Sequence, residues 1–406
     1  MSKRNRRLFT AIMITSLLQM APFALTPGIA KIQSEVFPQI SLSIIQTMMM
    51  LPGLLSMVFA LLSAFVIHKG WISKKISVVI GITLLATTGI AAIFLHTQIW
   101  HLILFSVLIG AGMGFYISTS ASIMFDNFNA EERRMSVGVQ TSAINLGGII
   151  ISAIGGYLAS LVWYGGYVFL LVAAPVAVIC MLLIPNDKKD NHAAGAPVHP
   201  KVKTKVPIDI YYYGIVTFVF LLVFAVCSTN ISSHIKAAGL GNTATAGITT
   251  AVQMVGGVSA GLIFNKLSAK LKDYMLPLAF LVVFAGYMII SAGSNSLAVN
   301  ILGVFIAGMA VSIIIPQCLF ATSNRVDQTN SATSTAIVNC IFPGVGGFLS
   351  PVLFTNLTTV LGGESTVYRF KFVGIVALIC GFILILTTRY RARKTPMEAV
   401  MAQATE

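Results

Sequence analysis

Long apolar stretches alternate with short polar ones along the whole chain. The apolar stretches run for about twenty residues or more, the length that an α-helix needs to cross the hydrocarbon core of a bilayer. Lipid offers no hydrogen-bond partner to an open backbone, so these stretches are predicted to be helices. Twelve of them can be placed, at residues 8–28, 44–67, 76–95, 99–122, 135–160, 166–185, 210–230, 244–265, 274–293, 297–320, 333–358 and 370–388. We therefore predict an all-α membrane protein with twelve transmembrane helices.

One long polar stretch divides this pattern into two equal parts. Residues 186–209 contain five lysines and three prolines, and six apolar stretches lie on either side. We interpret them as a cytoplasmic linker between two six-helix halves, residues 1–185 and 210–394, with a short cytoplasmic tail at 395–406. Three short similarities relate the halves: 110–115 to 306–311, 68–75 to 265–272, and 155–158 to 346–349. They indicate that both halves share one plan.

Composition and charge indicate what surrounds the chain and how it is oriented in the membrane. The chain is 56% hydrophobic and only 9% charged, so lipid rather than water must cover much of its surface. With a cytoplasmic N-terminus, 22 of the 26 Lys and Arg residues fall in cytoplasmic segments; the exceptions are Lys31, Lys236, Arg369 and Lys371. The positive-inside rule therefore predicts a cytoplasmic-membrane protein with both termini in the cytoplasm. The net charge of +14 matches anionic lipid headgroups, and nothing in the sequence indicates a nucleic-acid-binding module.

The predicted spans carry almost no ionisable chemistry. Every Asp, Glu and His lies in a loop or near the end of a span. An ionisable group in mid-membrane is the usual sign of a functional site, and a buried base, nucleophile or set of metal ligands cannot be assigned here. We therefore expect a protein that is not an enzyme, with no catalytic residue, metal site or cofactor. We also expect transport to proceed by facilitated diffusion, exchange or another ion rather than by proton coupling.

Neutral polar side chains are what the spans offer instead. Five amides lie inside apolar stretches and Tyr116 adds a phenol; the amides are Gln19, Asn145, Gln253, Gln317 and Asn339. An amide that faces lipid loses its hydrogen bonds at a cost of several kcal/mol, so these groups should face the interior of the bundle. Two roles remain open for each of them, hydrogen bonding between helices and contact with a solute.

The loop after the second span carries a family resemblance. Residues 63–81 read SAFVIHKGWISKKISVVIG, with Gly70 followed by the basic pair Lys74 and Lys75. With twelve spans split six and six, this resembles the major facilitator superfamily, whose loop between spans 2 and 3 typically reads G-x-L-x-D-R-x-G-R-R/K. The acid of that motif is missing here. We expect Asp126, at the inner end of span 4, to pair with the two lysines as a gate; a solvated basic loop that serves topology alone is the alternative.

The resemblance also implies a major facilitator fold and a central cavity lined by spans 1, 4, 7 and 10. It favours as solute contacts Gln19, Tyr116 and Gln317, with Asn230 near the outer end of span 7; Asn145 and Asn339 line the cavity or brace it. Two departures from the proton-coupled drug exporters are visible. Ser106 lies where many of them have an Arg, and Ser152 lies where the antiporter motif of span 5 has a Pro.

Prolines and glycines mark three places where spans should break or bend. One is residues 22–28 in span 1, with Pro22 and Pro27. The others are residues 51–53 in span 2 and residues 342–347 in span 11, which contain Pro343. A hinge that serves gating and a notch for packing a neighbouring helix are both consistent with this pattern.

The outer mouth is predicted to be basic. Its four Lys and Arg residues face only Glu35 and Glu364, and a basic vestibule would concentrate anions. An anionic solute is therefore favoured, with snorkelling of the long side chains to the headgroups as the alternative. If Glu35 dips into the outer cavity, about one helical turn beyond its predicted place, a salt bridge with the nearby Lys31 would make it a poor proton carrier.

Together these features predict a secondary transporter. It would move a small organic solute across the cytoplasmic membrane by alternating access of the two halves to a midplane site, and efflux is favoured over uptake by analogy. The alternative is a transporter-like membrane receptor that binds a solute without net transport. The expected partners are the solute and the bilayer, and the chain is expected to act as a monomer.

Overall fold

The computed structural model describes residues 2–185, 207–323, 334 and 336–403, without the side chains of residues 125, 130, 131, 133, 134, 137, 138, 265 and 392–403. The predicted linker, 186–209, lies almost wholly outside the described residues. Within them the chain is helical and contains no strand. Twelve segments are long and apolar enough to cross a membrane, which confirms the predicted number of spans.

The first half contains spans 1 to 6. Span 1 is assembled from five short elements: α1 (Lys3–Ser16), η1 (Ala21–Ala24), η2 (Thr26–Gly28), α2 (Ile29–Lys31) and η3 (Ile32–Val36). Spans 2 to 5 are single helices: α3 (Leu42–His68), α4 (Lys74–Phe94), α5 (Ile99–Asn127) and α6 (Ala130–Leu161). Span 6 is formed by α7 (Gly165–Val168), η4 (Phe169–Val172) and α8 (Ala173–Leu183).

The second half contains spans 7 to 12. Spans 7 and 8 are α9 (Ile208–Ala237) and α10 (Thr243–Leu271); span 9 is η5 (Lys272–Tyr274) with α11 (Met275–Ala292). Span 10 is α12 (Leu297–Met309) with α13 (Val311–Ser323). Span 11 is η6 (Ile337–Ile341), α15 (Phe342–Ser350), η7 (Pro351–Thr355) and α16 (Asn356–Val360), and span 12 is α17 (Thr366–Gln403).

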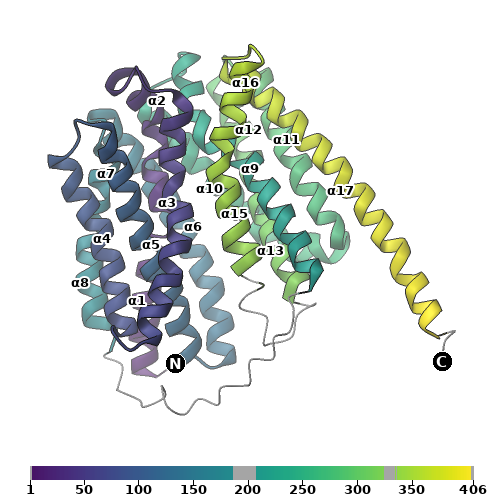
Figure 1. The fold of residues 1–406 in the computed structure, drawn as a ribbon, viewed down its shortest axis with the longest axis horizontal. Coiled ribbons are helices and arrows are strands. Elements are labelled where there is room, and N and C mark those ends of the chain that lie inside the picture. Colours follow the sequence, from purple (N-terminus) through teal and green to yellow (C-terminus); the bar gives the residue numbers. More distant parts are fainter. Residues whose placement is uncertain (1, 186–206, 324–333, 335, 404–406) are drawn as a thin grey trace.

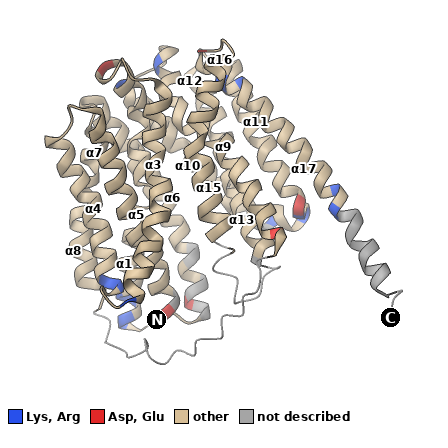
Figure 2. Cartoon of the chain, viewed as in Figure 1, with Lys and Arg blue, Asp and Glu red and all other residues tan. Residues whose placement is uncertain are grey.

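The helices stand side by side and both termini lie at the same end of the bundle (Figure 1). We call this the proximal end, at the bottom of the view, and the opposite end the distal end. Lys and Arg, like Asp and Glu, gather at the two ends, whereas the middle of the bundle is free of charge along most of its length (Figure 2). This distribution is what a bilayer around the middle of the bundle requires.

Each half has its own hydrophobic core. One cluster of buried apolar side chains runs from Leu8 to Ile184, and a second runs from Ile210 to Leu384. Tyr116 and Tyr167 are among the largest side chains in the first cluster, and Tyr213 and Tyr287 in the second. The two halves are therefore packed independently of one another.

Glycine pairs bring the same helices together in both halves. A Cβ atom on Gly81 of α4 would lie 2.6 Å from the Gly112 carbonyl oxygen of α5, and one on Gly286 of α11 would lie 2.7 Å from the Gly303 carbonyl oxygen of α12. Small residues of this kind let helix backbones approach closely in lipid, where apolar attraction between helices is weak. The shared device joins span 3 to span 4 and span 9 to span 10, in agreement with one plan for both halves.

The most extensive helix contacts between the halves are those of α6 with α10 and of α3 with α15. At the first crossing a Cβ atom on Gly156 would lie 2.6 Å from the Cα atom of Gly247. Ser152 Oγ donates a hydrogen bond to the Gly247 carbonyl at 3.1 Å. The serine that replaces the proline of the antiporter motif thus forms a polar contact between the halves.

Span 2 corrects one prediction. The helix α3 runs unbroken through Pro52, although residues 51–53 were expected to break it. Proline lacks an N–H, so the carbonyl of Met48, four residues earlier, loses its usual helical partner. Ser106 Oγ of α5 lies 2.7 Å from that oxygen and 2.8 Å from the Leu102 carbonyl of its own helix, so its single proton is shared between the two. The neighbouring helix thereby supplies the bond that the proline removes, which explains why α3 stays continuous.

The other proline sites follow the prediction more closely. Span 1 is broken into short elements at Pro22 and Pro27, and in span 11 Pro343 lies in the first turn of α15, just after the π-helical element η6. Residues 265–272, in contrast, are not a loop, because α10 extends through most of them to Leu271. The backbone reverses at Lys272, whose φ of 49° is left-handed. The helix α17 likewise continues into the predicted tail.

The contact between Ser106 and Met48 generates a stability prediction. Ser106→Ala should lower the free energy of unfolding by about 1–3 kcal/mol, because it leaves a buried carbonyl without a partner. Ser118→Ala on the same helix is the matched control, since its hydroxyl donates to the Gly114 carbonyl within its own helix. Thermal unfolding of the purified protein in detergent measures both variants. Equal melting temperatures for the two would contradict this account of span 2.

Candidate functional site

Polar contacts between the two halves gather at the distal end. Lys236, near the end of α9, donates to the Glu35 carboxylate of the first half at 2.7 Å. Ser232, one turn earlier, donates to the Pro27 carbonyl at 2.5 Å. It also accepts from the N–H of Ala30 at 3.4 Å. These bonds tie the irregular distal part of span 1 to span 7.

The expected pair between Glu35 and Lys31 is therefore wrong. Lys31 donates instead to two carbonyl groups at the end of α6, those of Ala159 at 3.3 Å and Ser160 at 2.8 Å. Carbonyl oxygens at a helix end lack helical partners and carry partial negative charge, which suits a cation. Lys31 thus braces the first half, and Glu35 remains free to pair with the second.

Gln46 is the central polar contact between the halves. Its side chain, on α3, is completely buried. Its Nε2 donates to the Thr229 carbonyl at 2.8 Å and to Asn230 Oδ1 at 2.9 Å, both on α9. Its Oε1 accepts from the Thr355 hydroxyl of η7 at 2.6 Å. One side chain of the first half is thus held by two spans of the second half, and all of its donors are used.

Asn230 connects this contact to a buried arginine. Its Nδ2 donates to the Val226 carbonyl and to Thr229 Oγ1, each at 3.0 Å. Its Oδ1 accepts from Gln46 and also from Arg369 Nη1, at 2.6 Å. The donors around the oxygen and the acceptors around the nitrogen fix the orientation of the amide. We call Gln46, Thr229, Asn230 and Thr355 the distal latch.

Arg369 departs from its predicted position. It was expected at an exposed outer mouth, but its side chain is only 2% exposed. It lies in the first turn of α17, and besides Asn230 its Nε donates to the Thr358 hydroxyl at 3.1 Å. The reason is that span 12 begins at Thr366, before the predicted start at 370, so the side chain belongs to the packed part of the bundle.

Two further predicted amides are buried inside the second half. Gln253 Oε1 accepts from the Ser228 hydroxyl at 3.3 Å, and Gln317 Oε1 accepts from the Ser268 hydroxyl at 2.8 Å. Both bonds join neighbouring spans. Of the two roles left open by the sequence, hydrogen bonding between helices is the one these geometries display. Their contact with a solute stays a prediction.

The remaining predicted contacts are dispersed. Tyr116 is buried in the core of the first half, and its hydroxyl is without a hydrogen-bond partner in the described structure. Gln19 is half-buried in the turn between α1 and η1. Asn145 donates to the Thr141 carbonyl of its own helix at 3.0 Å, and Asn339 is exposed in η6. The structure therefore brings Asn230 into the latch and does not gather the others around it.

Sequence reasoning missed three residues of the latch, Gln46, Thr229 and Thr355, and the burial of Arg369. Gln46 carried the same signal as the other amides, since it is the third residue of the predicted apolar stretch 44–67. Arg369 lies one residue before a predicted span. A shift of the span boundary by a single turn decides whether its side chain reaches the lipid headgroups or the interior of the bundle.

At the proximal end Lys74 forms an ion pair with Asp126, as expected, and donates to the Ser122 hydroxyl at 3.0 Å. All three residues belong to the first half, where they join the start of α4 to the end of α5. Gly70 has a left-handed φ of 73°, which lets the chain turn between α3 and α4. Lys75 was expected to share the Asp126 carboxylate, but it is half-buried and forms no ion pair with Asp126 in the described structure. A gating role for these residues stays a prediction.

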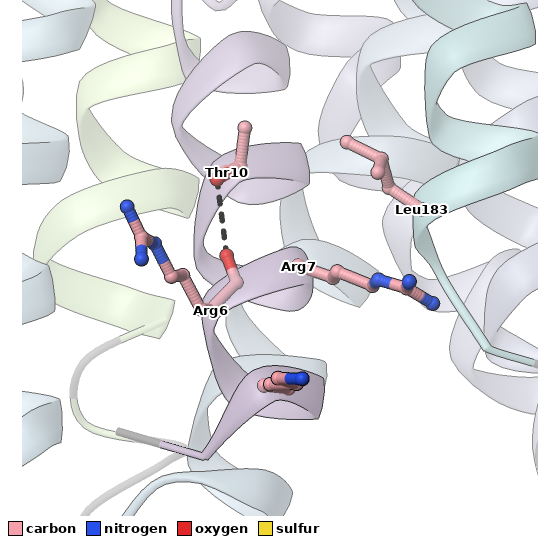
Figure 3. Close-up of a pocket in the computed structure, with 5 residues that line it drawn as sticks. Arg6, Arg7, Thr10 and Leu183 are labelled. Carbon is pink, nitrogen blue, oxygen red and sulfur yellow. Dashed lines mark hydrogen bonds between the residues drawn. The ribbon is translucent and has the colours of Figure 1, made fainter.

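A shallow hollow of about 280 Å³ also lies at the proximal end (Figure 3). It is lined by residues of α1 and one of α8, namely Lys3, Arg6, Arg7, Thr10 and Leu183. Three cationic side chains beside an apolar one suit the anionic lipid headgroups expected from the sequence. Their binding stays a prediction.

Comparisons with known proteins show which family and which solved structures this chain is similar to. A profile of the Major Facilitator Superfamily matches residues 8–351. Among solved structures, a bacterial homologue of the human lysosomal transporter Spinster, inward-facing and occupied, is similar at a TM-score of 0.69 and 16% identity, over 96% of this chain and 98% of that one. The nucleoside transporter NupG gives 0.72 and 12% over 93% and 99%, and the POT family transporter PepTSo gives 0.72 and 11% over 95% and 98%. Identities this low establish the fold alone. A comparison with curated protein sequences gave no match.

The latch generates a prediction about opening. Gln46→Leu keeps the size of the side chain but leaves the Thr229 carbonyl and the Thr355 hydroxyl without their partner, each at a cost of about 1–3 kcal/mol. We expect amide hydrogen exchange in residues 26–36 and 350–358 to rise about tenfold or more, since 1.4 kcal/mol corresponds to a factor of ten. Gln253→Leu is the control, because it removes a buried amide whose bond stays inside one half. Unchanged exchange in Gln46→Leu would show that the latch does not hold the halves together.

Proposed function

The chain belongs to the Major Facilitator Superfamily, and from this premise we propose that it moves a small organic solute across the cytoplasmic membrane by alternating access. It is a secondary transporter rather than an enzyme. The observation that carries the proposed mechanism is the distal latch between two independently packed halves. Two separately packed halves joined at the distal end by exchangeable polar contacts are suited to rocking around a central site.

The latch bears on which state of the transport cycle the described structure represents. Basic residues dominate the predicted cytoplasmic segments, so we assign the proximal end to the cytoplasm. The latch then closes the side that faces away from the cytoplasm, as alternating access requires of any state that does not open outward.

Export is the direction that we favour, and a receptor without net transport is the competing function. Both would bind a solute between the halves, but only a transporter must release it on the other side. A screen of small organic solutes in reconstituted vesicles, followed as uptake and as efflux, separates them. Net flux in either direction excludes the receptor, and its sign gives the direction.

A cross-link across the distal end tests alternating access directly. Ala30 and Ser232 are buried and in contact, with 3.4 Å between the Ala30 nitrogen and Ser232 Oγ. In a background with Cys340 and Cys380 replaced by Ala, oxidation of Ala30→Cys/Ser232→Cys should stop solute flux, because the distal end can no longer open. Reduction should restore the flux. Each single cysteine variant is the control and should transport under both conditions. Undiminished flux through the oxidised double variant would contradict alternating access at this interface.

Energy coupling gives a second prediction. Glu35 and Asp126 lie at opposite ends of the bundle with half-exposed side chains, at 53% and 51%. A proton carrier must titrate at membrane depth, so neither carboxylate is placed for that task. We expect a pH gradient alone to drive no accumulation of the solute found in the screen. Downhill exchange should persist in Glu35→Gln and Asp126→Asn. Uphill transport in wild type that either substitution abolishes would identify the proton carrier that we consider missing.

A further inference from the structure

Arg369 is a buried cation without an anionic partner. Its two side-chain hydrogen bonds go to neutral groups, the amide oxygen of Asn230 at 2.6 Å and the hydroxyl of Thr358 at 3.1 Å. Among the residues that the structure describes, no Asp or Glu lies within ion-pair distance of it. A guanidinium carries five N–H donors, and the contacts made here come from Nε and Nη1.

Other cations of this chain are treated differently. Lys236 pairs with Glu35 and Arg391 with Asp209, and all four side chains are at least two-fifths exposed. Arg391 also lies over the ring of Tyr212, 3.7 Å from its centroid. Water would reduce the cost of leaving those charges unpaired, whereas at 2% exposure it gives Arg369 little help. Arg369 is thus more deeply buried than these paired cations, and it has no acid beside it among the described residues.

The position of Arg369 connects it to the moving interface. Asn230 Oδ1 accepts from Arg369 and from Gln46 of the first half at the same time. When the halves separate at the distal end, Gln46 leaves with α3, and the latch around Arg369 loses its cover. The hydroxyl of Thr358 remains beside the guanidinium on the second half, and the Thr355 hydroxyl is released from its bond to Gln46.

We propose that Arg369 binds the carboxylate of an anionic organic solute, with Asn230 occupying its place in the latched state. A guanidinium fork matches two carboxylate oxygens, and such charged hydrogen bonds are stronger than the one to a neutral amide. The proposal rests on the transport function above and names the class of its solute. The sequence predicted that an exposed, basic outer mouth attracts anions; this proposal assigns that attraction to one buried side chain instead.

Thermal unfolding of the purified full-length protein in detergent tests this with defined probes. Sodium benzoate and sodium acetate are compared with their neutral analogues benzamide and acetamide, and with sodium chloride at equal ionic strength. We expect a carboxylate to raise the melting temperature of the wild type by about 2–4 °C over chloride, and the amides to leave it unchanged. The shift should disappear in Arg369→Gln, which removes the charge.

Asn230→Asp is the sharper variant. It changes one atom and supplies a permanent carboxylate beside Arg369, so an added carboxylate should no longer shift the melting temperature. Arg391→Gln is the matched control, since it removes an arginine at the other end of the same helix and should keep the shift. Should Arg369→Gln fail to fold, Arg369→Lys retains the charge without the fork, and its shift should fall below half that of the wild type.

Three results would overturn the proposal: no carboxylate shift in the wild type, an equal shift with chloride or the amides, or a shift that survives in Asn230→Asp. Its failure is separable from that of the transport mechanism. Flux that stops on cross-linking Ala30→Cys to Ser232→Cys without any carboxylate shift would remove this proposal alone. The opposite result is a carboxylate shift that is lost in Arg369→Gln, together with solute flux that continues after cross-linking. It would contradict alternating access at this interface and support the anion site.

Discussion

A polar group buried in a membrane-spanning bundle must find its hydrogen bonds inside the protein, and this constraint organises the structure. It explains why Ser106 lies against the carbonyl that Pro52 leaves without a partner. It also explains why Ser152 lies at the crossing of α6 and α10, where its hydroxyl reaches a backbone oxygen of the other half. Gln46 is the extreme case, because all of its polar atoms are satisfied by the second half.

The same constraint makes the interface reversible. Apolar surface gains little by leaving lipid for another helix, so close packing and polar contacts decide whether the halves meet. A buried hydrogen bond in a membrane protein is worth about 1 kcal/mol, so the three bonds of Gln46 supply about 3 kcal/mol. That corresponds to a preference of about a hundredfold, whereas a complete switch from 1:99 to 99:1 needs about 5.5 kcal/mol. The latch is thus strong enough to bias the two states and too weak to lock one of them.

The twelve spans could be predicted because each is a long run of apolar residues, where an error of a few positions changes little. The site could not, because it depends on single turns and on partners distant in the sequence. Arg369 changed from a surface charge to a buried one through a shift of four residues at the start of span 12. Glu35 has Lys31 as its neighbour along the chain, yet it pairs with Lys236, about two hundred residues away. Only the packing of one half on the other makes that choice.

The neutral amide at position 230 is what keeps this region exchangeable. An aspartate there would face Arg369 in a poorly hydrated environment, where the attraction between opposite charges is several times that in water. The arginine would then be held in one arrangement whether the halves were together or apart. With asparagine the guanidinium has a neutral hydrogen-bond acceptor while the latch is closed. A carboxylate forms a stronger hydrogen bond with a guanidinium than an amide oxygen does, so a charged ligand can displace the asparagine. The same oxygen also receives Gln46, so a residue of neutral chemistry serves both the closure between the halves and the arginine behind it.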